Sequence, residues 1–112
     1  MTKHARKATE LDANGIEVHF SPEVKNAFAD LAAAVHFSKH FDGDILSIVQ
    51  DWASGKPLSV HSVFISLPLI AAETSRHVRA TRDERATEAW REICLKMPEK
   101  GFTLTPVRHR GM

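Results

Sequence analysis

Glycine and proline residues divide this chain into segments of roughly ten to twenty residues, and this division most strongly limits what it can fold into. Pro22, Gly43, Gly55, Pro68 and Pro98 each lie next to a run with apolar residues at helical spacing. Because proline lacks an amide hydrogen and glycine favours helix ends, the pattern predicts a series of short helices. The predicted helices comprise residues 22–40, 45–54, 59–67, 71–81 and 84–97.

The first of these helices has a strong start signal and one clearly apolar face. Ser21 supplies an N-cap hydroxyl, and Pro22 stands at the first helical position, where proline is favoured. Four apolar side chains recur at spacings of four, three and four residues, which places that face in the core. They are Val24, Phe28, Leu31 and Val35.

The opposite face of this helix carries small residues, an aromatic ring and two histidines, and small residues let another helix approach closely. The set consists of Ala29, Ala33, His36, Phe37 and His40. This face either packs within the same domain or forms the interface of a homodimer.

Short strands are predicted on both sides of the helical region. Residues 16–20 alternate apolar and polar side chains, and residues 102–107 have a similar extended composition. The two strands either pair with each other, or the second forms a reduced wing. Residues 1–14 are interpreted as a flexible basic arm, and residues 15–112 as a single domain, since 112 residues rarely hold two cores.

The segment of residues 59–67 allows two interpretations. Its β-branched residues favour a strand, whereas Val60, Val63 and Leu67 follow helical spacing. We favour a short helix. Pro68 disfavours helical geometry at the residue before it, so this helix is predicted to end there.

Three consecutive helices at residues 45–54, 59–67 and 71–81 would form a tri-helical helix-turn-helix unit. In such a unit the last helix projects from the domain and fits the major groove of DNA, which is wide enough for one helix. The predicted fold class is therefore mainly α, with a helix-turn-helix core, additional N- and C-terminal helices and two short strands.

The residues of the third helix suit contact with DNA. Arg76 and Arg79 can bind guanine with two hydrogen bonds or pair with phosphate, and Ser75 can bond to a base edge. Thr74 and Arg82 are assigned to the DNA backbone.

Residues 71–82 carry three arginines against one acid, Glu73, a local charge of +2. Glu73 would repel phosphate unless it accepts a bond from a cytosine amino group or pairs with a neighbouring arginine. The competing interpretation is that these arginines line the solvated face of an ordinary helix.

Residues 44–80 resemble the helix-turn-helix core of winged-helix regulators of the multiple-antibiotic-resistance (MarR) type. The likeness rests on residues 44–49, 55–63 and 71–80, where small and hydroxyl residues precede an Arg-His-Val-Arg run. Residues 102–106, Phe-Thr-Leu-Thr-Pro, resemble the second strand of the wing in that family. The resemblance implies a dimeric DNA-binding regulator whose recognition helix lies in the major groove.

The chain departs from this family in the region of the wing. Where the family has a β-hairpin, residues 84–97 read as a helix anchored by Trp90 and Ile93. A long C-terminal dimerisation helix is also lacking. The face of the first helix described above is therefore our candidate for the dimer interface.

Charge and hydropathy limit the classes of function. Fifteen basic and fourteen acidic residues give a net charge of +1, which argues against purely electrostatic DNA binding. Residues 1–56 carry −2 (6 basic, 8 acidic) and residues 57–112 carry +3 (9 basic, 6 acidic), so an anion-binding surface is expected in the second half. The longest apolar stretch, residues 60–72, is too short and polar to cross a bilayer, and a cytoplasmic protein is expected.

Catalytic and metal sites have little support in the sequence. Cys94 lies beside core positions and is expected to be a small buried hydrophobe. His36 and His40 have the spacing of a metal-binding pair, but no third ligand accompanies them. We therefore expect no enzymatic activity, no metal and no cofactor.

The predicted function is binding of double-stranded DNA in transcriptional control, as a homodimer with residues 71–81 in the major groove. Arg108 and Arg110 are assigned to an adjacent groove or phosphate. The alternative is a non-enzymatic protein-interaction module, such as an adaptor, an inhibitor or an accessory subunit, that has a helix-turn-helix-like core. The balanced net charge and Glu73 favour this alternative. The sequence neither predicts nor excludes a small-molecule effector.

Overall fold

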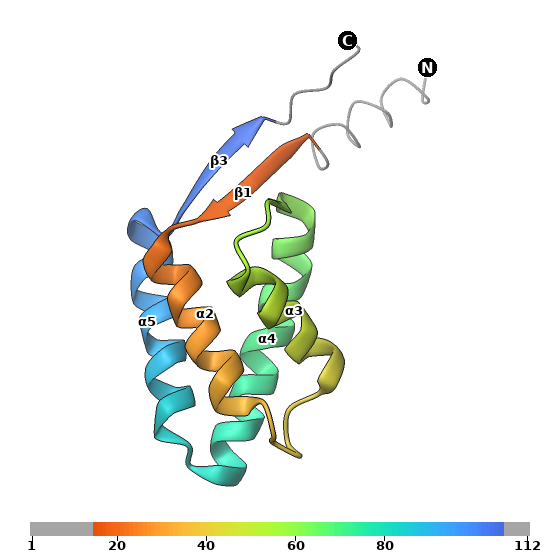
Figure 1. The fold of residues 1–112 in the computed structure, drawn as a ribbon, viewed down its shortest axis with the longest axis vertical. Helices are drawn as coiled ribbons and strands as arrows, with labels where there is room; N and C mark the ends of the chain where they lie inside the picture. Colours follow the sequence, from red (N-terminus) through yellow and green to blue (C-terminus); the bar gives the residue numbers. More distant parts are fainter. Residues whose placement is uncertain (1–14, 107–112) are drawn as a thin grey trace.

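A computed structural model describes residues 15–106 of the chain, and Figure 1 shows a helical body with strands at one end. The elements are β1 (Ile16–Phe20), α2 (Pro22–Val35), α3 (Gly43–Ala53), β2 (Leu58–Ser59), α4 (Val60–Thr81), α5 (Glu84–Lys100) and β3 (Phe102–Pro106). The prediction of a mainly α fold with short strands is confirmed. The predicted arm of residues 1–14 lies outside the described residues.

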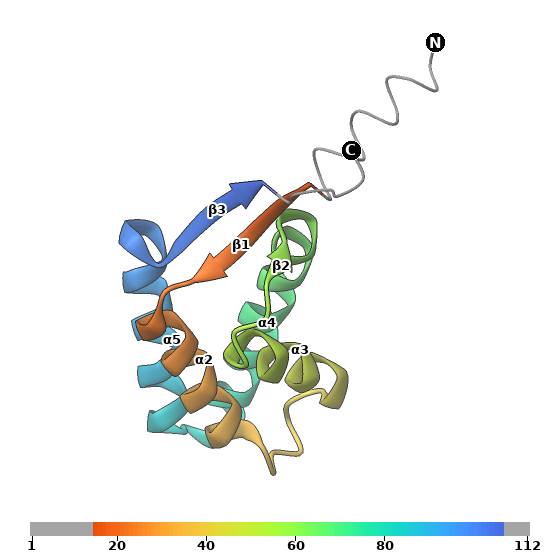
Figure 2. The ribbon, with the colours of Figure 1, turned by 45° about the horizontal axis from the view of Figure 1, so that its top comes forward.

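The three strands form an antiparallel sheet in the order β2-β1-β3. Phe20 lies opposite Phe102 and Ile16 lies opposite Pro106, so the two predicted strands pair with each other along their full length. β2, which the sequence did not predict, adds two residues on the other side of β1. Figure 2 shows this sheet above the ends of the helices.

The core lies where α2 packs between α5 and α3. The predicted apolar stripe of α2 is confirmed, because Val24, Phe28, Leu31 and Val35 are at most 1% exposed. The rings of Phe20, Phe28 and Trp52 lie 5.3–5.5 Å apart, which joins β1, α2 and α3. Such aromatic clusters bury a large apolar area in the favoured tilted and edge-on geometries.

Two boundaries near the end of α2 differ from the prediction. The helix ends at Val35 and not near His40, because Phe41 leaves the helical path and becomes buried with 6% of its surface exposed. The next helix begins at Gly43, since the Asp42 carboxylate accepts hydrogen bonds from the first free amide groups of α3.

The predicted division of residues 59–81 into two helices is wrong, because Val60–Thr81 forms the single helix α4. The predicted tri-helical unit is therefore α3 followed by one long helix. Ile70 is fully buried, and Val63 and Leu67 pack against the core on the same side. This stripe keeps its spacing across Pro68, so an unbroken helix buries all of it.

The proline penalty explains why the local signal failed. A proline inside a helix costs about 3 kcal/mol, whereas burial of one aliphatic side chain contributes about 1.5–3 kcal/mol. The buried stripe on both sides of Pro68 outweighs that cost. Pro68 itself is exposed, and so is Phe64, whose carbonyl group loses its helical partner and faces water.

The last helix, α5, also continues past a proline, since it reaches Lys100 and not Met97. Asp83 caps its start, and its buried face consists of Ala86, Ala89 and Ile93. Cys94 is exposed and not buried as expected.

The end of α5 and the start of α2 meet at Gly101. The Ser21 amide donates a hydrogen bond of 2.7 Å to the Gly101 carbonyl. A Cβ atom on Gly101 would lie 2.4 Å from the Met97 Cα and 2.7 Å from the Lys96 carbonyl oxygen. Only glycine fits here without a backbone shift.

We expect Gly101→Ala to lower the free energy of unfolding by about 1–3 kcal/mol, the usual cost of overpacking. Urea titration followed by circular dichroism measures this change. Gly43→Ala is the control, because a Cβ atom there meets nothing within 4 Å. Equal stability of the two variants would contradict the close approach at Gly101.

Candidate nucleic-acid interface

The helix α4 has a buried side and an exposed cationic side in its C-terminal half. Ile70, Thr74 and His77 are at most 3% exposed and hold this half against the rest of the protein. Four predicted DNA-contacting residues lie on the exposed side or at its end. These are Ser75, Arg76, Arg79 and Arg82.

Arg76 is partly neutralised by an acid of its own helix. Its Nη2 atom lies 2.9 Å from the Glu73 Oε1 atom, and 54% of its side chain remains exposed. The same Glu73 oxygen accepts a hydrogen bond of 3.0 Å from the Asp42 amide, which fixes the carboxylate at the start of α3. Because exposed ion pairs contribute at most about 1 kcal/mol, a phosphate can compete for Arg76.

Arg79 and Arg82 differ from Arg76 in their surroundings. Both are exposed, and within residues 15–106 neither forms an ion pair with a carboxylate. Their guanidinium groups are therefore available to an external anion.

Arg82 has an unusual backbone conformation. It follows the last residue of α4 with φ 60° and ψ 33°, in the left-handed region that glycine normally occupies at a helix end. A side chain in this conformation costs about 1–2 kcal/mol. Its amide still closes the helix with a bond of 2.7 Å to the Val78 carbonyl.

Three of the predicted contact residues need correction or lie beyond what the structure describes. Thr74 is 2% exposed, so it cannot touch the DNA backbone as predicted, because it belongs to the buried stripe of α4. Its hydroxyl has no hydrogen-bond partner within the described part of the protein. Arg108 and Arg110 lie outside the described residues.

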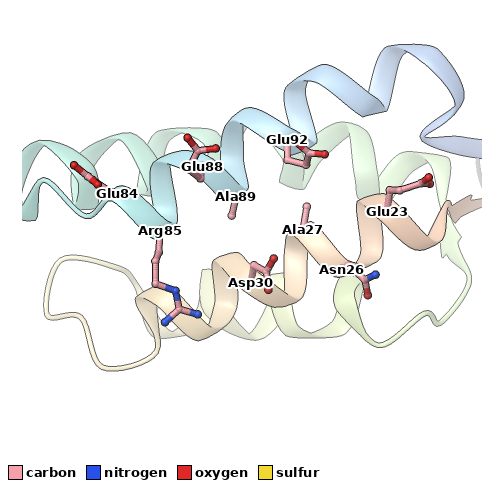
Figure 3. A pocket seen from close by; sticks show the side chains of 9 residues that line it. All are labelled: Glu23, Asn26, Ala27, Asp30, Glu84, Arg85, Glu88, Ala89 and Glu92. Atoms are coloured by element: carbon pink, nitrogen blue, oxygen red, sulfur yellow. The ribbon is translucent and has the colours of Figure 1, made fainter.

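The surface formed by α2 and α5 has the opposite charge. Five carboxylates and one guanidinium line a groove of about 690 Å³ between these helices, a local charge of −4 (Figure 3). The two helices approach closely at Ala27 and Ala89, while Glu23, Glu92 and Asp30 lie along the rim (Figure 3). Like charge repels a polyanion, so this surface is unfavourable for DNA.

The residues of the predicted dimer face are exposed to solvent, but only Ala29 and Ala33 lie on α2, because the helix ends at Val35 and the other three follow it. Phe37 has 92% of its surface exposed, and its ring packs edge-on against His36 at 4.5 Å. Ala29, Ala33 and His40 are also exposed. An exposed phenylalanine of this extent is a feature that an interface would cover.

His77 is a buried polar residue that sequence reasoning missed. Its Nδ1 atom lies 2.7 Å from Ser38 Oγ, and its Nε2 atom lies 2.8 Å from Asp83 Oδ2. It continues the spacing of Ile70 and Thr74 along the buried side of α4, and this spacing could have predicted its burial. Its partner Ser38 is 39 positions away, so no local pattern reveals the contact.

The carboxyl group of Asp83 has a lowered pKa. Burial alone would raise it, but the hydrogen bond from His77 and those from the Ala86 and Arg85 amides outweigh that effect. The charged form of Asp83 is therefore stabilised in the folded protein.

Comparison with known proteins adds no relative: no protein-family model, no curated protein and no solved structure matches the chain. Within residues 15–106, no cluster of three potential metal ligands is present. No helix in that part is both long and apolar enough to pass through a bilayer.

The Asp83 pKa predicts a specific pH dependence of stability. A carboxyl whose pKa is lowered by folding stabilises the protein above its unfolded-state pKa, near 3.8, and this contribution is lost as the pH falls through the lower folded-state value. We expect thermal melts to show a shallower loss of stability for Asp83→Asn than for the wild type as the pH falls from 5 towards 3 (about the range in which such carboxyls protonate). Identical slopes would contradict the lowered pKa.

Proposed function

We propose that the protein binds double-stranded DNA through the exposed side of α4 and the turn that follows it. The observation that carries this proposal is Arg82, an exposed arginine in a strained backbone conformation that glycine would adopt without cost. Strained residues persist where their side chains have a role, and they cluster at binding sites. A guanidinium at this position suits recognition of phosphate.

The distribution of charged residues also favours the exposed side of α4 as the DNA-binding surface. Arg76 and Arg79 lie on the exposed side of α4, three residues or about 4.5 Å apart along its axis. Arg82 follows directly after the last turn of this helix. The carboxylates of the α2/α5 groove lie on other helices, and Glu84, two residues after Arg82, is the one nearest to it in the sequence. DNA would therefore meet the exposed side of the C-terminal half of α4.

The mode of contact differs from that of the predicted helix-turn-helix. α4 is 22 residues long, and its first half is apolar on both sides. The proposed contact uses only its second half, with Ser75, Arg76 and Arg79 towards the groove and Arg82 on the backbone. A regulator of transcription that acts as a homodimer is the function this contact would serve.

Arg82→Gly separates binding from stability. The substitution removes the strain of the left-handed conformation, so the free energy of unfolding should rise by up to about 1 kcal/mol. At the same time DNA affinity should fall, and the slope of log K against log salt concentration should decrease by about 0.9 for one lost phosphate contact. Fluorescence anisotropy with a mixed-sequence duplex at several salt concentrations measures both affinity and slope.

Arg79→Ala should lower the affinity in the same way. Arg91→Ala is the matched control, because Arg91 is exposed on α5 and paired with Glu88 at 2.7 Å. Absence of binding by the wild type at low salt, or an equal effect of all three variants, would refute the proposed surface.

The second candidate function, a protein-interaction module, is favoured by the first half of α4. Phe64, Ile65 and Leu69 are 80%, 52% and 45% exposed, although the other side of the same helix is in the core. A helix that is apolar on all sides is usually covered on all sides. This surface would bind an apolar face of a partner protein.

Sedimentation velocity distinguishes the two apolar surfaces. If the homodimer uses the α2 face, Phe37→Ser should shift the equilibrium to monomer, whereas Phe64→Ser should leave it unchanged. Both side chains are largely exposed, so neither change should alter the melting temperature much. The reverse pattern would place the interface on α4 and favour the interaction module.

A further inference from the structure

Three side chains from separate elements meet at the end of the helical body opposite the sheet. Ser38 lies in the connection between α2 and α3, His77 lies on α4, and Asp83 is the N-cap of α5. The Ser38 Oγ–His77 Nδ1 distance is 2.7 Å and the His77 Nε2–Asp83 Oδ2 distance is 2.8 Å. The imidazole therefore bridges a hydroxyl and a carboxylate.

The direction of the two hydrogen bonds follows from the groups present. Ionised Asp83 can only accept, so the Nε2 atom of His77 carries a proton and donates it, and in the uncharged ring the Nδ1 atom then has the lone pair. The Nδ1 lone pair then accepts a hydrogen bond from the Ser38 hydroxyl. This is the donor and acceptor order of a serine nucleophile, an imidazole base and an orienting carboxylate, with the two ring nitrogens exchanged relative to serine proteases.

A surface pocket adjoins Ser38 and His77. Ser38 and His77 line a pocket of about 290 Å³ together with Phe37, Lys39 and Thr81. His77 is 3% exposed and Ser38 is half-buried, so the imidazole is shielded from water. Lys39 adds a positive charge among the residues that line it.

We propose that Ser38 is an activated nucleophile that reacts with small carboxylic esters. The Ser38 oxygen attacks the carbonyl carbon while its proton passes to His77 Nδ1. The alcohol then leaves and takes that proton, which gives an ester of Ser38. Water attacks this ester with His77 as base, and the acid and free Ser38 are released.

A purely structural connection accounts for part of this arrangement. Ser38 Oγ also accepts a hydrogen bond of 3.0 Å from the His40 amide, which holds the turn after α2. A structural role would have the same two hydrogen bonds, because a buried imidazole needs a partner at both ring nitrogens, so only the pocket beside Ser38 distinguishes the two roles. The two interpretations differ in the reactivity of Ser38.

The test uses a fluorophosphonate probe, in which the serine oxygen displaces fluoride from phosphorus, and intact-protein mass spectrometry. We expect one adduct on the wild type, located at Ser38 by peptide mapping, and none on Ser38→Ala. Hydrolysis of p-nitrophenyl acetate should fall to the buffer rate in the same variant. The protein is diluted until sedimentation shows a monomer, since a partner on Phe37 would cover the pocket.

Asp83→Asn tests the relay without removing the nucleophile. An asparagine amide donates to Nε2 and so favours the tautomer with a proton on Nδ1, which cannot accept from Ser38. We expect labelling to slow at least tenfold, while the asparagine still caps α5. Ser47→Ala, at an exposed serine of α3, should label at the wild-type rate.

Two results would overturn the proposal. One is the absence of any Ser38 adduct on wild-type protein whose circular dichroism spectrum and melting curve show that it is folded. The other is labelling of Asp83→Asn at the wild-type rate, which would show that the carboxylate does not direct the imidazole.

Discussion

The continuity of α4 determines most of what this protein presents to its surroundings. The core-facing side chains Val63, Leu67, Ile70 and Thr74 keep one phase along the helix, which continues through Pro68. As a result the helix reaches the end of the body opposite the sheet (Figure 1). His77 and Arg82 are delivered there by the same element, one pointing into the protein and one at its surface.

Local signals predicted the elements that depend on local chemistry. The Ser21 cap, the α2 stripe and the two paired strands follow from spacing and capping residues that lie within a few positions of each other. Pro68 misled the prediction because its penalty is local, whereas the burial that offsets it comes from α3, α5 and the sheet. The proline penalty can be read directly from the sequence. The burial that offsets it can be judged only once the fold is known.

In the candidate site, too, local features were predictable and features that depend on the fold were not. Exposure of Arg76 and Arg79 follows from their position opposite the buried stripe, and an Arg76–Glu73 pair at three-residue spacing was among the predicted possibilities. The left-handed conformation of Arg82 was not predictable, because nothing in an arginine favours it. The contact of Ser38 with His77 depends on where the connection between α2 and α3 passes α4, so spacing in the sequence carries no trace of it.

The antiparallel pairing of β1 with β3 has a topological consequence. Ile16 and Pro106 are direct neighbours across the sheet, so the described chain enters and leaves the fold at the same place. A short linker could join these positions, and new ends could be opened in the exposed connection of residues 54–57. Such a circular permutant would preserve every helix while changing the order in which they are synthesised.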